Sequence, residues 1–361
     1  MSNMALKRVP ASIRHSPTLS RLDISCNRIN DLEHVQLSDI PSLSSLKVQN
    51  NKLFSIPSYF IQMKALKYLN ISNNKFETFP SVVCEMSNLV DLDVSFNEIA
   101  ELPSEMSNLK SLERFSCIGN IITGFPVSFS TLANMRVLDV RKNRITDLNV
   151  VYSLPSLTTL RADHNNLVTL DARLGAKVRE FSVPHNSITR FTLAPLTDMA
   201  ATYSLTHLNL SYGKISTLAD EALSELVNLI ELKLDFNQFT RLPDTLNRLT
   251  KLEVFSCADN MLNALPSGLG SMQDLRILNA HNNNLKGFPP DIWMCGKIEV
   301  INGSSNLIEF LPDPPANFAD LVPAADGRKM SVASATSMTD KPAFKGPPAG
   351  YSLQRGDVLV N

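Results

Sequence analysis

The sequence has few of the residues that mark a disulfide-stabilised or metal-binding protein. Its 361 residues include five cysteines, scattered along the chain, with no Cys-x-x-Cys pair and no cluster of His and Cys. Such spacing is typical of reduced thiols and favours neither a zinc site nor a disulfide framework. We therefore expect no metal site and a cytoplasmic protein, peripheral to a membrane only through a partner.

An excess of one charge and long apolar runs are also missing. The 34 Lys and Arg residues nearly balance the 35 Asp and Glu residues, which leaves a net charge of -1. A general nucleic-acid binder needs a surplus of Lys and Arg to neutralise phosphates, so we expect no nucleic-acid partner. No stretch of about 18 apolar residues occurs, and the N-terminal residues lack the pattern of a secretory signal, so no transmembrane segment is expected.

Catalytic motifs are absent as well. The sequence contains no Gly-rich phosphate loop, no His-Glu-x-x-His, no Gly-x-Ser-x-Gly and no kinase signature. His164 and His185 occupy equivalent places in adjacent repeats, but no third ligand of a suitable type aligns with them. We expect no catalytic residue and no cofactor in this chain.

Leucine and asparagine, by contrast, recur in one frame, Leu-x-x-Leu-x-Leu-x-x-Asn-x-Leu. One more copy fits with Gly213 in the Asn place, so the sequence predicts about thirteen repeats of about 23 residues. The frame asparagines are Asn27, Asn51, Asn74, Asn97, Asn120, Asn143, Asn165, Asn186, Asn237, Asn260, Asn283 and Asn306.

This frame resembles the leucine-rich repeat, and each part of it has a physical reason. The Leu-x-Leu core is a short strand whose leucines point inward while the intervening residues point outward. The Asn turns the chain after the strand, and its amide can pair with backbone groups of its own and the neighbouring repeat. The predicted fold is an α/β solenoid, a horseshoe with a parallel sheet on its concave face.

We predict two parts of the chain: a solenoid over residues 1–312 and a Pro/Ala/Ser-rich, disordered linker or tail over residues 313–361. The first residues resemble the second half of a repeat, so we expect no true N-terminal cap and interpret the chain as a piece of a longer protein. The irregular residues 192–213 are equally consistent with a docking site and with evolutionary drift. In the tail, Ser331 follows two basic residues and is a candidate phosphorylation site, although such short matches are common by chance.

A partner is expected on the concave face, which carries the outward strand residues and the two residues before each frame Asn. In the middle repeats these positions combine basic and aromatic residues, a composition typical of interface hot spots and suited to an acidic partner. Solvated, unrelated residues are the alternative. The candidate partner-binding residues are Phe96, Arg141, Lys142, Arg161, His164, His185, Tyr212 and Phe236.

The 23-residue unit, with Leu-Pro after the Asn, resembles the intracellular Ras-group class of leucine-rich repeats. Within that class the chain is similar to the repeat region of fungal adenylate cyclases. The segments that carry this resemblance are 115–117 (Phe-Ser-Cys), 255–257 (Phe-Ser-Cys), 278–280 (Leu-Asn-Ala) and 301–306 (Ile-Asn-Gly-Ser-Ser-Asn).

The resemblance implies a Ras-binding regulatory segment in cAMP signalling, with a Ras-type small GTPase as partner. It also implies that Mg²⁺ and the cyclase catalytic residues belong to a domain that would follow in the parent protein. The alternative is a free-standing scaffold in Ras, kinase or phosphatase signalling without a catalytic domain.

Overall fold

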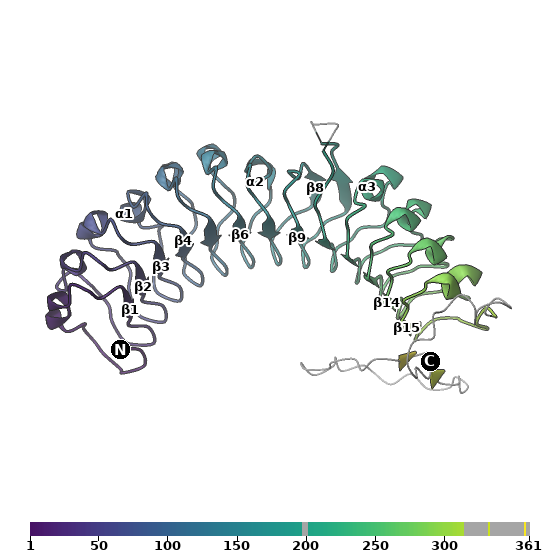
Figure 1. Ribbon diagram of the computed structural model, residues 1–361, viewed down its shortest axis with the longest axis horizontal. Helices are drawn as coiled ribbons and strands as arrows, with labels where there is room; N and C mark the ends of the chain where they lie inside the picture. The colour runs from purple at the N-terminus through teal and green to yellow at the C-terminus, as the bar shows by residue number, and fades with distance from the viewer. Residues whose placement is uncertain (197–200, 314–330, 333–356, 359–361) are drawn as a thin grey trace. The chain divides into compact units, whose positions relative to one another are not determined.

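The computed structural model describes residues 1–196, 201–313, 331–332 and 357–358. These residues form two compact units, drawn along the chain in Figure 1. The first unit contains Met1–Val168, Ala172–Asn186 and Ala194–Ala201; the second contains Thr169–Asp171, Ser187–Leu193 and the described residues from Thr202 onward.

The first unit is a stack of repeats, each with one three-residue strand. Neighbouring strands pair in parallel, and the central inward residues lie opposite one another, as Leu69 does to Leu92 and Leu92 to Phe115. The strands lie side by side, and the helical turns lie on the opposite side of each coil (Figure 1). They are β1 (Arg21–Asp23), β2 (Ser45–Lys47), β3 (Tyr68–Asn70), β4 (Asp91–Asp93), β5 (Arg114–Ser116), β6 (Val137–Asp139), β7 (Thr159–Arg161) and β9 (Glu180–Ser182).

The segment that returns from one strand to the next begins, in several repeats, with a proline. Pro80 and Pro103 have φ near -70° and an extended ψ, and each directly precedes a short helical turn. Proline fits this place because its fixed φ and missing N–H cost little before the first helical residue. The turns of this unit are η1 (Ala11–His15), η2 (Leu37–Asp39), η3 (Ser58–Gln62), α1 (Ser81–Cys84), η4 (Ser104–Asn108), η5 (Val127–Thr131) and α2 (Asn149–Tyr152).

The second unit repeats the same coil. Its central strand residues align from Leu208 through Leu232 and Phe255 to Ile301. The strands are β11 (His207–Asn209), β12 (Glu231–Lys233), β13 (Val254–Ser256), β14 (Ile277–Asn279) and β15 (Val300–Asn302); the turns are α3 (Asp220–Ser224), η6 (Asp244–Arg248), η7 (Leu269–Ser271) and η8 (Pro290–Met294).

The core of both units is made by the frame positions. Leu89, Leu92 and Val94 are fully buried, and Cys117 and Cys257 occupy the same inward position as Val94 in other repeats. No repeat can bury this apolar side alone, so each is stabilised by its neighbours. The thirteen described strands at frame positions confirm the predicted parallel-stranded solenoid.

Two further features lie outside this pattern. Strands β8 (Thr169–Ala172) and β10 (Arg190–Leu193) form a separate two-stranded sheet in the irregular region. Of the predicted tail after residue 313, the structure describes only the backbone of β16 (Ser331–Val332) and β17 (Asp357–Val358), which pair in parallel. The candidate phosphorylation site Ser331 lies in β16, but its side chain, like the remainder of the tail, is outside the described residues.

Candidate protein-binding surface

The frame asparagines tie each repeat to the one before it. The Asn97 amide nitrogen donates to the carbonyl oxygen of Val94 in its own repeat (2.9 Å) and to that of Ile71 in the preceding repeat (3.2 Å). Its amide oxygen accepts a bond from the Phe76 N–H at 3.2 Å. Because Asn97 is buried, these bonds replace water for backbone groups that would otherwise be unpaired. Equivalent bonds are made by Asn27, Asn51, Asn74, Asn120, Asn143, Asn165, Asn186, Asn237, Asn260, Asn283 and Asn306.

The residue directly before each frame Asn, or before Gly213, makes the turn that follows the strand. In every described repeat its φ is positive, from 50° at Asn73 to 64° at Gly119. Sequence reasoning missed this requirement, although the Asn and Asp residues at several of these places are types enriched in the left-handed region. We call this set the turn residues: Cys26, Asn50, Asn73, Phe96, Gly119, Lys142, His164, His185, Tyr212, Phe236, Asp259, Asn282 and Ser305.

Six of the eight candidate partner-binding residues are therefore turn residues. Phe96 is 50% exposed, and its ring covers Gly119, the next turn residue. A Cβ atom on Gly119 would lie 2.7 Å from that ring, so only glycine leaves room for it. Ile121 is also exposed in the same repeat as Gly119. The result is an aromatic side chain that packs against Gly119 and is half exposed to solvent.

The two arginines among the candidate partner-binding residues are paired with carboxylates. Arg141 makes a two-pronged contact with Asp139, with Nε and Nη2 each 2.8 Å from a carboxylate oxygen. Arg161 binds Glu180 in the same manner, at 2.7 and 2.9 Å. The hydrogen bonds that Arg141 donates to Asp139 raise the pKa of Arg141, and those that Arg161 donates to Glu180 raise the pKa of Arg161. The locally basic middle that the sequence suggested is thus a network of mixed charge.

Lys142, His164 and His185 follow one another as turn residues. The imidazole rings of His164 and His185 stack in parallel, with centroids 4.1 Å apart and planes 6° from each other. Burial and the neighbouring His164 lower the pKa of His185. Burial raises the pKa of Asp163, the residue before His164, and its carboxylate accepts a hydrogen bond from the Ser182 hydroxyl at 2.8 Å.

The remaining two candidates lie in the second unit. Tyr212 and Phe236 stack with ring centroids 4.2 Å apart and planes 13° from each other. They are 41% and 43% exposed, so each ring offers apolar area to a partner. Next to Phe236 in the chain, burial raises the pKa of Asp235, which accepts hydrogen bonds from Ser256 and from the Ala258 N–H.

The described residues offer little for metal or thiol chemistry. They contain no group of three or more His, Cys, Asp and Glu that could hold a metal ion. Burial raises the pKa of the Cys84 and Cys295 thiols to about 12, which keeps them protonated and unreactive near neutral pH. Within the described part of the chain, no helix is long and apolar enough to cross a membrane.

Comparison with known proteins connects this geometry to a family. A leucine rich repeat family model matches residues 17–76 and 41–99. An adenylate cyclase of Mycosarcoma maydis is 46% identical over 115 residues, which are 32% of this chain and 4% of the relative. An adenylate cyclase of Schizosaccharomyces pombe is 30% identical over 125 residues, 34% of this chain and 7% of the relative.

The chain has the leucine-rich repeat fold, and about a third of it is similar to fungal adenylate cyclases. The matched segments are a small part of both relatives, 4% and 7% of their lengths. With this fold, the chain is a protein-interaction region.

Solved structures agree on the fold. A leucine-rich repeat protein of Leptospira interrogans has a TM-score of 0.66 at 24% identity and covers 86% of this chain and 90% of its own. An internalin from Listeria monocytogenes has a TM-score of 0.69 at 21% identity, covering 89% of this chain and 90% of its own. At this identity the likeness concerns the repeat architecture alone.

Proposed function

We propose that this chain is the Ras-binding regulatory leucine-rich repeat segment of a fungal adenylate cyclase, acting in cAMP signalling. The similarity of its repeats to two fungal adenylate cyclases is the observation that carries the proposal. In that setting the chain is cytoplasmic and reaches a membrane only through its GTPase partner. Catalysis and the Mg²⁺ that it needs belong to another part of such a cyclase.

The surface of the first unit that carries Phe96, Arg141 and Arg161 has the composition of a protein interface. Phe96 supplies a rigid exposed ring, and Arg141 and Arg161 are already oriented by their carboxylate partners. Aromatic and arginine side chains dominate interface hot spots, and ordered side chains lose less entropy on binding. An acidic partner surface would share these guanidinium groups with Asp139 and Glu180, since each guanidinium has more donors than one carboxylate uses.

The direct test is binding of a recombinant fungal Ras-type GTPase to the full chain by isothermal titration calorimetry. The GTPase is loaded either with a non-hydrolysable GTP analogue or with GDP. The proposal expects binding of the GTP-analogue form and much weaker binding of the GDP form. Equal affinity for the two forms, or no binding of either, would contradict it.

A pair of variants locates the interface. The double charge reversal Arg141→Glu and Arg161→Glu is expected to weaken binding by at least about tenfold, because both charges then oppose an acidic partner. Lys110→Glu is the matched control, since Lys110 lies in the return segment after η4 and away from the strands. An equal loss in the control and the double variant would exclude this surface as the site.

A further inference from the structure

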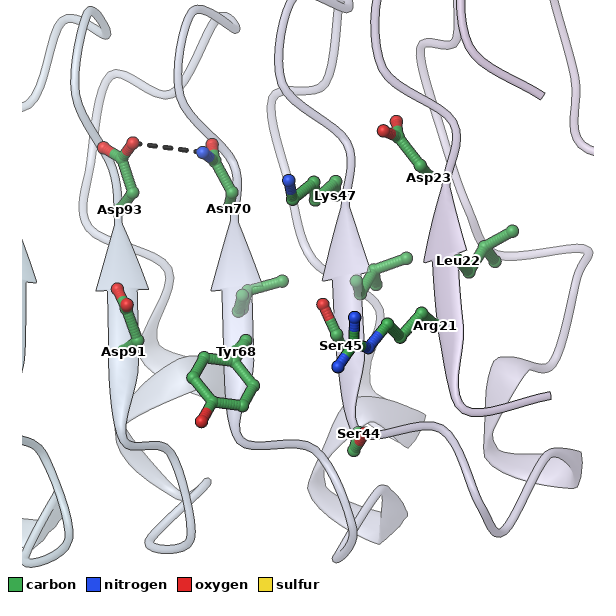
Figure 2. Close-up of a pocket in the computed structure, with 12 residues that line it drawn as sticks. Arg21, Leu22, Asp23, Ser44, Ser45, Lys47, Tyr68, Asn70, Asp91 and Asp93 are labelled. Atoms are coloured by element: carbon green, nitrogen blue, oxygen red, sulfur yellow. Dashed lines mark hydrogen bonds between the residues drawn. The ribbon is translucent and has the colours of Figure 1, made fainter. Parts of the chain in front are cut away.

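A separate hollow lies on the outward face of the first four strands and includes none of the candidate partner-binding residues. It is lined by the outward residues of β1 to β4, which form two rows across the strands (Figure 2). One row contains Arg21, Ser45, Tyr68 and Asp91, and the other contains Asp23, Lys47, Asn70 and Asp93.

The positive side of the hollow is formed by β1 and β2. Arg21 and Lys47 are both exposed, and neither forms an ion pair within 4.0 Å among the described residues. Figure 2 shows the Arg21 side chain extended towards Ser45. The Asp23 carboxylate instead accepts bonds from the hydroxyl and N–H of Ser25, at 2.6 and 3.0 Å. Lys47 also contributes to the lowered pKa of Asp23 through their charge interaction, but neither cationic group is held in a direct ion pair among the described residues. Two cationic groups on neighbouring strands can thus approach a further carboxylate.

The negative side is formed by β4. Asp93 accepts bonds from the amide nitrogen of Asn70 (3.1 Å) and from the Ser95 N–H (2.9 Å), as Figure 2 shows for the first of these. Both donors are neutral, so the carboxylate keeps its negative charge uncompensated. Asp91 lies beside it and binds Arg114 with Nε 2.8 Å from the carboxylate. Asp93 is therefore the acceptor that a cationic group would meet.

Tyr68 stands between the two sides. It projects from β3, between Ser45 and Asp91, and is 43% exposed. Its ring offers an apolar face in an otherwise polar hollow, and aromatic rings of this kind anchor side chains at interfaces.

The spacing of these groups fits an extended polypeptide that crosses the strands. Paired strands lie about 4.8 Å apart, so β1 and β4 are separated by roughly 14 Å. An extended chain rises about 3.4 Å per residue and points alternate side chains to the same face, so residues i and i+4 span roughly the same distance. The residue midway between them, roughly 7 Å from β1, falls between β2 and β3, beside the strand that carries Tyr68.

We propose that this hollow binds an extended peptide segment of a partner protein that carries one carboxylate and one cationic side chain four residues apart, with an apolar residue midway. The carboxylate lies against Arg21 and Lys47, the apolar side chain against Tyr68, and the cationic group against Asp93. This site is independent of the proposed GTPase surface, and it accepts a partner of mixed rather than acidic charge.

Fluorescence anisotropy with short labelled peptides tests the site on the full chain. The probes are Ser-Glu-Ser-Leu-Ser-Lys-Ser and its reverse order, and the control is Ser-Ser-Glu-Lys-Leu-Ser-Ser, with the same two charges adjacent. At least one of the two spaced peptides, in which Glu and Lys are four residues apart, is expected to bind more tightly than the control. Equal binding of all three peptides, or binding of none, would overturn the proposal.

Variants then assign the charges. Arg21→Glu with Lys47→Glu is expected to weaken the spaced peptide by about tenfold and to favour a peptide with Lys at both positions, since both sides of the hollow are then negative. The matched control is Lys52→Glu with Lys64→Glu, two exposed lysines outside the hollow. If the control variant shifts affinity equally, or the Lys/Lys peptide gains nothing from the first variant, the assignment is wrong. If the full chain binds the spaced peptide but not the GTPase, the proposed function fails while the peptide site stands.

Discussion

The repeat that ends in Phe96–Asn97 and the repeat that ends in Tyr212–Gly213 differ at the position that defines the frame. Both have a strand at the same place, β4 in the first unit and β11 in the second. Both turn at an aromatic residue in the left-handed region, with φ 53° at Phe96 and 56° at Tyr212. Only the first has a side-chain amide, which bonds to the backbone of the preceding repeat.

The comparison shows that the turn and the connection between repeats have separate causes. The left-handed residue makes the turn, because it is present whether an Asn or a Gly follows. The Asn amide supplies the bonds to the preceding repeat, and Gly213 has no side-chain atoms with which to make them. Gly213 is the first residue of the second unit that stands at a frame Asn position.

The largest expected effect is that of removing an amide from the regular repeat. Asn97→Ala leaves several buried backbone donors and acceptors without a partner, and we expect a loss of about 3–4 kcal/mol in the free energy of unfolding. Urea unfolding followed by circular dichroism measures it. Asn88→Ala is the matched control, because Asn88 is exposed and makes one bond to the Lys64 carbonyl oxygen; a similar loss there would remove the special role of the frame amide.

Gly119→Ala perturbs the turn instead of the amide. The new alanine would have a backbone in the left-handed region, with φ 64°, and its Cβ would lie 2.7 Å from the Phe96 ring. We expect a loss of about 1–2 kcal/mol from backbone strain together with displacement of the ring. The thermal unfolding midpoint reports the loss. Gly124→Ala is the control, because no atom lies within 4 Å of a Cβ there; unchanged stability in both variants would contradict the packing of Phe96 on Gly119.

Gly213→Ala perturbs the interrupted repeat, and a smaller effect is expected. A Cβ there meets the Asn237 amide oxygen at 2.7 Å, and that oxygen also accepts a bond from the Ile215 N–H. Gly213 is not in the left-handed region, and alanine reduces the entropy of the unfolded chain, so the net loss should be under about 1 kcal/mol. A loss in urea unfolding as large as that of Asn97→Ala would show that both repeats depend equally on this position.

The smallest effect is that of pH on the stacked pairs of the two units. Since burial and His164 lower the pKa of His185 in the folded protein, the unfolded chain binds this proton first as pH falls. Stability should therefore be constant above about pH 6.5 and decrease below it. Hydrogen exchange should show faster amide exchange at the His164–His185 turns, after correction for the intrinsic pH dependence of exchange, and no change at Tyr212–Phe236. The variant His185→Phe should lose this response; a response that persists would assign it to another group.

The sequence predicted the solenoid because the apolar frame determines which residues are inward, and those residues alone account for the strands and their register. The left-handed turn residues were not predicted, because Phe96, Lys142 and His164 share a backbone conformation and no side-chain property. The charge network was also missed. Arg161 and Glu180 are 19 residues apart, and their contact depends on how β7 aligns with β9.

The structure changes the interpretation of the outward-face charges and of the first four strands. Single-residue charges on the outward face do not describe a surface when the neighbouring strand supplies the opposite charge, as Glu180 of β9 does for Arg161 of β7. None of the candidate partner-binding residues came from the first four strands. Yet the exposed Tyr68, together with Arg21 and Lys47, which form no ion pair within 4.0 Å among the described residues, gives these strands a hollow of defined chemistry.

The central claim is that a GTP-loaded Ras-type GTPase binds the surface of the first unit that carries Phe96, Arg141 and Arg161. Isothermal titration calorimetry with the variants Phe96→Ala and Phe54→Ala tests it most directly, because both remove an exposed phenylalanine, 50% and 64% accessible, from the same unit. The account predicts that Phe96→Ala weakens binding by about tenfold or more while Phe54→Ala leaves the affinity unchanged. Equal affinities of both variants and the unmodified chain would contradict it.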